Sequence, residues 1–143
     1  MKRNRALISF VLVLTILIGL LAPASAAPML RASSYIDSFF ADCMRTGNAI
    51  SVGWDIAGNG QQKILGVSEI SLYEKVGSTT TCVKTWYMSS TTSMIAYNSR
   101  FHCGTNLYYG AKTNAQYYAV VTFIGGASSS ACDTRTYTTA TIK

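Results

Sequence analysis

The sequence predicts an all-β protein, an antiparallel β-sandwich of about seven strands. Three observations predict it. Apolar and polar residues alternate over short stretches, which is the period of a half-buried strand. A turn signal follows about every ten residues, as in sandwich proteins. No ten-residue segment after residue 50 has a helical period.

Residues 1–26 have the order of a secretory signal peptide. A short basic start, Met1–Arg5, is followed by the apolar run Ala6–Ala22 and then by small residues ending at Ala26. The run is near the lower limit for spanning a bilayer, so an uncleaved membrane anchor is the competing interpretation. Because Pro23 ends the helix and Ala24 and Ala26 suit a signal peptidase, we expect a helical leader cleaved near Ala26. The protein is then secreted, with no membrane segment after cleavage.

Cleavage leaves 117 of the 143 residues, enough for one domain. We divide them into a lead-in or first strand, 27–46, and a sandwich domain, 47–143. Removal of the leader leaves nine Lys and Arg against six acids, a net charge of +3. These charges are scattered singly, and nucleic-acid binding needs a clustered basic footprint. We expect no nucleic-acid partner, and we expect a monomer.

Alternation and turn residues predict the first strands of the chain. Ser33–Met44 fits either a helical face or a first strand, and the strand agrees better with the rest of the chain. Ile50–Ile56 alternates as a strand, and Gly58–Gly60 is a turn signal. Ile64–Val76 predicts the next strand.

Four further strands follow. Cys82–Met88 is rich in β-forming residues, and Phe101–Tyr109 and Gln116–Ile124 are the next two predicted strands. A Gly/Ser-rich loop occupies 125–133. The last predicted strand is Thr134–Ile142.

All four cysteines, Cys43, Cys82, Cys103 and Cys132, lie after the leader. An even number in a small exported chain predicts two disulfides. Free thiols or a metal site are the alternatives, but no C-x-x-C pair is present for zinc. We prefer Cys82–Cys103, which lie on either side of the Ser89–Ser93 turn as in a hairpin. The pair Cys43–Cys132 then follows by elimination.

Four segments carry a family resemblance. They are Gly47–Val52 running to Gly58–Gly60, then Gly66–Glu74, Tyr117–Phe123 and Arg135–Thr139. Over about residues 47–143 the chain resembles a family of small exported proteins of Gram-positive bacteria, chiefly clostridia, classed as a domain of unknown function. The resemblance implies an Ig-like or fibronectin-type-III-like β-sandwich and no activity, and the cysteines do not belong to its pattern. It also implies a corner role for Tyr117, with the ring in the core and the hydroxyl bonded to the preceding loop.

Candidate catalytic groups are few. His102 beside Cys103 suggests a nucleophilic pair, but neighbouring residues on a strand point to opposite faces. Glu69 and Glu74 have opposite parity within one strand, which does not suit a glycosidase carboxylate pair. The acids are also not clustered as calcium requires. We expect no catalytic residue, no metal and no cofactor.

Aromatic residues are the unusual component, with nine tyrosines and two tryptophans. We expect Trp54 and Tyr117 to belong to the core. Parity along the strands puts at least one member of each adjacent aromatic pair outside, which gives Trp86, Tyr109 and Tyr118 as candidates for ligand binding. Exposed rings can stack on sugars or anchor a protein, although they can also serve only cross-strand packing.

The sequence therefore predicts a non-catalytic binding module that meets a glycan or a cell-envelope or protein partner. Two other functions remain open. One is a small secreted hydrolase that uses Glu69, Glu74 or His102. The other is a secreted toxin or bacteriocin-like effector, which a small basic exported domain would suit.

Overall fold

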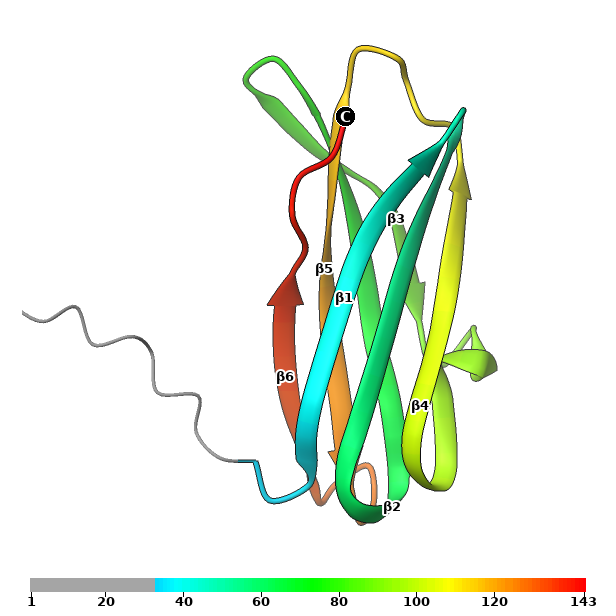
Figure 1. The fold of residues 1–143 in the computed structure, drawn as a ribbon, viewed down its shortest axis with the longest axis vertical. Coiled ribbons are helices and arrows are strands. Elements are labelled where there is room, and N and C mark those ends of the chain that lie inside the picture. The colour runs from blue at the N-terminus through cyan, green and yellow to red at the C-terminus, as the bar shows by residue number, and fades with distance from the viewer. Residues whose placement is uncertain (1–32) are drawn as a thin grey trace, which may run out of the picture. The chain divides into compact units, whose positions relative to one another are not determined.

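The backbone is all-β, as the alternation predicts (Figure 1). The structure is a computed structural model that describes residues 33–143, so the expected signal peptide lies outside the described residues. Within that range, no helix is long and apolar enough to span a membrane. Its elements are β1 (Ile36–Thr46), β2 (Ala49–Val76), β3 (Thr79–Tyr87), the 3-10 helix η1 (Thr92–Met94), β4 (Ile95–Tyr109), β5 (Gln116–Gly126) and β6 (Cys132–Thr138).

One long strand, β2, organises a single antiparallel sheet. Figure 1 shows β2 curving round at one end of the molecule and running back, and β4 turning beside it. The curve contains Gly60 at φ 83°, and β4 turns at Asn98, the one non-glycine residue with positive φ in the described chain. The Gln61 side-chain amide donates to the Asn98 carbonyl at 2.8 Å, which ties the two curved strands together. The sheet is therefore curled on itself.

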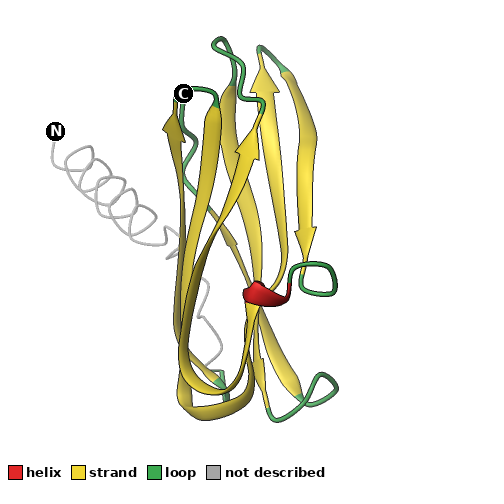
Figure 2. Ribbon diagram, turned by 90° about the vertical axis from the view of Figure 1, so that its right-hand side faces the viewer, coloured by secondary structure: helices red, strands yellow, loops and turns green. Residues whose placement is uncertain are grey.

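The curl produces two layers of strands that face each other. The first half of β2 pairs with β1 and with most of β4, and the second half pairs with β3 and β5, with β6 beyond β5. The 3-10 helix η1 connects β3 to β4 at the side of the molecule (Figure 2). Antiparallel register puts residues directly opposite each other on one face, so alternate residues of every strand face the interior.

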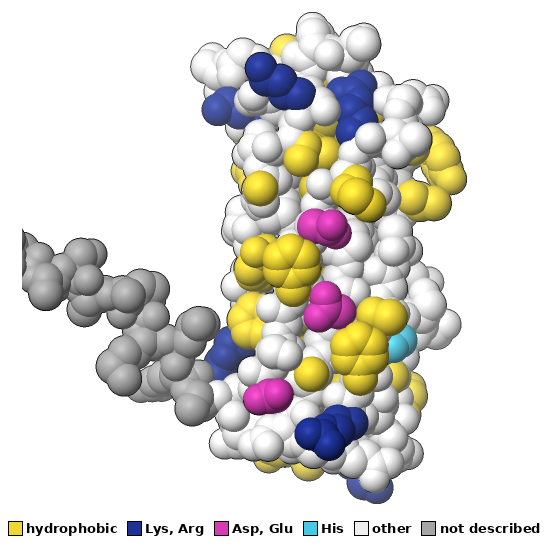
Figure 3. All heavy atoms as spheres, in the orientation of Figure 1, with side chains coloured by type: hydrophobic (Ala, Val, Ile, Leu, Met, Phe, Trp, Pro, Cys, Tyr) yellow, Lys and Arg dark blue, Asp and Glu magenta, His cyan; other side chains and the backbone are white. Residues whose placement is uncertain are grey.

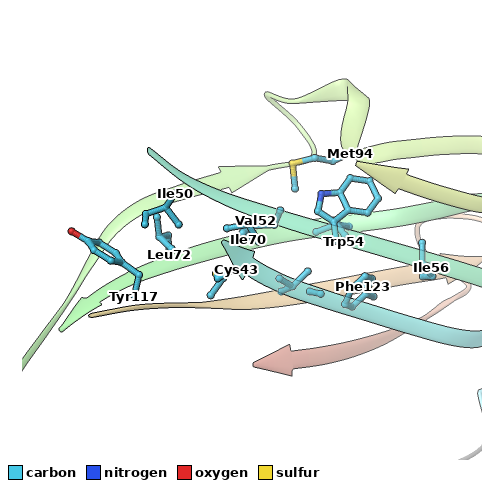
Figure 4. Close-up of a cluster of buried hydrophobic side chains, with 14 of the residues drawn as sticks. Cys43, Ile50, Val52, Trp54, Ile56, Ile70, Leu72, Met94, Tyr117 and Phe123 are labelled. Carbon is cyan, nitrogen blue, oxygen red and sulfur yellow. The ribbon is translucent and has the colours of Figure 1, made fainter. Parts of the chain in front are cut away.

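The core fills the space between the layers (Figure 4). The first half of β2 contributes the buried side chains that the alternation predicts, and the second half of β2 and β5 supply the opposing wall. Within residues 33–143, every buried side-chain nitrogen or oxygen has a hydrogen-bond partner. Fully buried residues include Ile50, Val52, Ile56, Ile70, Leu72, Tyr117 and Phe123.

The described chain has six strands where about seven were predicted. The difference arises because the strands expected at 50–56 and 64–76 are one continuous strand. Gly58–Gly60 does mark a change of direction, as its composition suggests. However, Gly58 still pairs with Ile36, so strand pairing continues into the curve.

The ambiguous segment before residue 47 is a strand rather than a helix. From Ser38 to Thr46, β1 pairs residue by residue with β2. Ala41 and Cys43 point into the core while Phe40 and Met44 point outward, which is the period of two that a strand requires. Residues 33–143 form one compact unit that includes β1.

The predicted Cys82–Cys103 disulfide is not formed, because the hairpin that would hold it does not exist. Gly77, at φ 60°, turns the chain after β2 so that β3 pairs with the strand before it. β4 also pairs with β2, which puts Cys82 opposite Tyr73 and Cys103 opposite Asp55, in different layers.

The predicted Cys43–Cys132 disulfide is also absent, and the sheet register explains why. The Cys43 thiol lies against the Ala119 backbone, whereas Cys132 pairs with Gly126. Seven residues of β5 separate these partners, about 23 Å of strand. A disulfide needs Cα atoms within about 7 Å. All four cysteines are free thiols.

We expect the thiols to react in the order of their exposure. Cys82 and Cys103 are exposed, Cys132 is half-buried and Cys43 is buried, where desolvation raises the pKa of its thiol. In a titration with a thiol reagent, two groups should react fast, one slowly and one only on unfolding. Alkylation of the unfolded, unreduced protein should add four groups. Addition of none would mean that two disulfides form in spite of this register.

Candidate functional site

The three aromatic residues predicted to bind ligand do not come together. Trp86 is half-buried and packs against the core rather than facing outward. Tyr118 lies on the outer face of the second layer, where its ring stacks on Tyr73 at 5.1 Å and 10°. Tyr109 is exposed at the end of β4, on the other layer. The Tyr73–Tyr118 contact is the cross-strand packing that was the alternative to a binding role.

The residues considered for catalysis are also apart. Glu69 accepts a hydrogen bond from Ser71 on the outer face of β2, whereas Glu74 is buried on the inner face. His102 contacts the Ser93 carbonyl at 2.9 Å through Nε2 and points inward, while Cys103 points outward. These side chains share no site.

Glu74 belongs instead to a buried polar network at the end of the sheet opposite the curve. The Tyr117 hydroxyl donates to Glu74 Oε2 at 2.6 Å and accepts from the Lys112 backbone N–H at 2.8 Å. Lys112 Nζ donates to Glu74 Oε1 at 2.7 Å. The network joins β2, β5 and the loop before β5, and the Tyr117 ring is fully buried. The network ties the loop before β5 to the ends of β2 and β5, which is a structural role.

Charge complementarity sets the pKa values in this network. The hydrogen bonds from the Lys112 ammonium and then from the Tyr117 hydroxyl hold the pKa of the Glu74 carboxyl below its ordinary value, against the opposing effect of burial. Burial, followed by the hydrogen bond to Glu74, raises the pKa of Tyr117. Glu74 is therefore ionised at neutral pH, and its charge stabilises the fold rather than serving as a general acid.

We expect acid to weaken the fold through Glu74. A carboxyl whose pKa is depressed on folding adds stability above its unfolded pKa of about 4.3, and this is lost as the pH falls through the folded value. Glu74→Gln should lower the free energy of unfolding by about 1.5–3 kcal/mol at pH 7 and by less at pH 3. Urea unfolding at both pH values measures this.

Glu69→Gln is the matched control for that series, because Glu69 is on the same strand and faces the other way. It should leave the stability nearly unchanged at both pH values. An equal loss for Glu74→Gln at pH 7 and pH 3 would contradict the role assigned to its charge.

The outer face of β1, the first half of β2 and β4 has most of the exposed large apolar side chains of the described chain. We call it the three-strand face. Five of the eight exposed large apolar side chains lie on it, at 49–70% exposure, while other outer surfaces have them singly. Figure 3 looks onto this face and shows apolar side chains with acids between them. Exposed apolar groups that gather in this way mark interaction sites. The five are Phe40, Met44, Phe101, Leu107 and Tyr109.

A groove runs along this face because its middle strand has small side chains. The outward residues of β2 here are small except for one acid. Larger side chains stand along the β1 side and at the two ends of the β4 side, where Thr105 and Cys103 are the middle residues. Register aligns Met44 with Ser51 and Leu107, and two residues further along it aligns Asp42 with Gly53 and Thr105. The outward β2 residues that form the floor are Ala49, Ser51, Gly53, Asp55 and Ala57.

The middle of the groove is hollow and acidic. A hollow of about 390 Å³ has Phe40 and Met44 on the β1 side and the carboxylates of Asp42 and Asp55 beside them. The rest of its lining is Gly53, Trp54, Cys103, Gly104 and Thr105. The Asp42 carboxylate lies directly over Gly53, where any Cβ would meet its Oδ1. The one ion pair within residues 33–143 is Lys112–Glu74, so neither of these aspartates is paired there.

The apolar residues of β4 face solvent because the Trp54 side chain occupies the space under its inner side. Trp54 projects from β2 toward β4, and its ring covers Gly104, which has no side chain in the way. Its Nε1–H donates to the buried Asn106 Oδ1 at 3.0 Å, and His102 packs edge-on at 5.1 Å. Small and polar residues therefore face inward around the indole, and Leu107 faces solvent.

Sequence reasoning missed this surface, although a signal was present. Alternation in 101–109 separates an apolar set from a polar set, and the natural assumption is that the apolar set faces the core. The presence of Gly104 and Asn106 opposite a tryptophan is what reverses the assignment. No pattern in β1 alone shows that Asp42 lies beside Gly53.

A comparison with protein-family models, with curated proteins and with solved structures finds no match for this chain. Within residues 33–143, no three His, Cys, Asp or Glu side chains are grouped so that they could hold a metal ion.

Proposed function

We propose that this protein is exported and acts as a non-catalytic binding module for a cell-envelope component, a glycan or another protein. The single observation that carries the proposal is the three-strand face, which has five of the eight exposed large apolar side chains of residues 33–143 and a hollow lined by two of them, Phe40 and Met44. Solvation of such a surface is unfavourable, and a partner that covers it recovers that free energy. Export through the signal peptide predicted at 1–26 would bring the protein to a partner outside the cytoplasm.

The finer fold class is part of the same proposal. We assign the curled sheet to the Ig-like or fibronectin-type-III-like sandwiches. The support is Tyr117, whose ring is buried and whose hydroxyl accepts from the loop five residues upstream, as a corner tyrosine does.

The dispersal of Glu69, Glu74 and His102 supports binding over hydrolysis. Acid–base hydrolysis by these three residues would need two of them within hydrogen-bond reach of one substrate position. Glu74 is held by Lys112 and Tyr117, and His102 lies against a backbone carbonyl.

The proposal is tested by capture from envelope extract and by a glycan array, with three proteins compared. Wild type should retain a component that the double variant Phe101→Ser/Leu107→Ser does not. Tyr97→Ser is the matched control, because Tyr97 is exposed on β4 outside the groove and its loss should change nothing. No groove-dependent retention in either assay would overturn the proposal.

A further inference from the structure

The groove on the three-strand face has a repeat that matches an extended polypeptide. Its rows, each made of one residue from β1, β2 and β4, recur every second residue of β2. That spacing is about 6.6 Å, the distance between same-face side chains of any extended chain. A segment lying along the groove would therefore present one side chain to each row.

The rows alternate in chemistry. At one end, Met44 and Leu107 flank Ser51. In the next row Asp42 and Thr105 flank Gly53, and in the row after that Phe40 and Cys103 flank Asp55. Phe101 lies one row further, beside Ala57. Apart from Asp55, the floor consists of small residues, so recognition depends on the flanking side chains and the two acids.

Asp42 and Asp55 sit at neighbouring rows. Asp42 is opposite Gly53, and Asp55 is two residues further along β2, which makes the two aspartates diagonal neighbours about 7–8 Å apart. An apolar occupant would strip water from carboxylates that have no ion-pair partner within residues 33–143, at a substantial cost in free energy. A cation placed between them would instead gain charge-assisted hydrogen bonds.

Resting on the proposed function, we infer that the groove binds an extended peptide segment whose groove-facing residues are apolar, cationic and apolar at every second position. The lysine or arginine meets Asp42 and Asp55. One apolar residue meets Met44 and Leu107, and the other meets Phe40, with Phe101 one row beyond it. A second copy of this chain fits poorly, because two-fold stacking of the face would bring its own aspartates together. A neutral sugar can donate hydroxyl hydrogen bonds to the carboxylates but brings no positive charge to offset theirs, so its hydrogen bonds are weaker than those of a cation.

The test uses a fluorescein-labelled peptide, Ser-Leu-Thr-Lys-Thr-Leu-Ser, and a matched peptide with Gln in place of Lys, in anisotropy titrations. Wild type should bind the Lys peptide about tenfold more tightly than the Gln peptide, a margin that added salt reduces. In Asp42→Asn/Asp55→Asn the two peptides should bind alike. Phe101→Ser/Leu107→Ser should weaken both.

Equal affinity of wild type for both peptides, or a Lys preference that survives in Asp42→Asn/Asp55→Asn, would overturn the inference. The peptide swap needs no altered protein, so misfolding of a variant does not obscure the result. If neither peptide binds while capture from envelope extract still depends on Phe101 and Leu107, the inference fails and the proposed function stands. Retention of an amino-sugar glycan, or dimerisation through this face, would likewise replace the peptide as occupant.

Discussion

Gly66→Ala should cost more stability than any other glycine-to-alanine change in the sheet. Gly66 lies in β2 between Ile95 of β4 and Ile124 of β5, at φ 156°. A Cβ there would overlap the carbonyl oxygen of Met94, a buried residue that has little room to move. The steric and backbone contributions are each about 1–3 kcal/mol, so the free energy of unfolding should fall by about 2–6 kcal/mol.

Gly60→Ala separates the two contributions. Gly60 also has positive φ, but no atom lies within 4 Å of a Cβ built there. The free energy of unfolding of Gly60→Ala should therefore fall only by the backbone contribution, about 1–2 kcal/mol. Urea unfolding of both variants measures the difference. Equal losses would show that the Met94 carbonyl at the end of η1 does not lie against Gly66 of β2.

Trp54→Ala should have the second large effect, because the indole fills the space between β2 and β4. Large-to-small changes of buried aromatic residues cost about 3–5 kcal/mol. The change would also leave the buried side-chain oxygen of Asn106 without the hydrogen bond that it accepts from the indole N–H. Calorimetry or urea unfolding should show the loss, and the groove should lose its ligand because β4 is no longer positioned.

Trp54→Phe is the control that keeps most of the ring volume and removes the donor. Its cost should be about 1–3 kcal/mol, mainly from the unpaired Asn106. If Trp54→Ala were as stable as Trp54→Phe, the indole would not be the element that holds β4 in place.

Much of the fold could be predicted from the sequence because strand alternation is local. Ile50–Ile56 alternates in the sequence and in the structure, and its apolar members are buried. The merging of two predicted strands into β2 could not be predicted, because continued pairing beyond Gly58 depends on a distant partner, Ile36. Turn composition signals a change of direction but not whether pairing stops.

The predicted disulfide pairing was wrong for the same reason, that strand pairing depends on distant residues. Symmetry about the Ser89–Ser93 turn suggested a hairpin, but Gly77 allows a tighter turn that takes β3 back to β2 first. A local pattern shows that a strand exists without showing which strand it pairs with. Disulfide geometry depends entirely on that second fact.

The candidate surface was the least predictable feature. Alternation assigns Phe101 and Leu107 to one face of β4 and His102 and Asn106 to the other, without showing which face is inside. Which face of β4 is buried depends on Trp54, a residue of another strand. Trp86 shows the converse case, an aromatic residue expected outside that packs on the core.

The most direct test of the account is amide chemical-shift mapping by NMR with the component captured from envelope extract. Binding through the three-strand face should shift the amide signals of residues 40–44, 51–55 and 103–107 and leave the Tyr73–Tyr118 surface unchanged. Shifts centred on Tyr73 and Tyr118, or spread evenly over the chain, would contradict the assignment of this groove as the site.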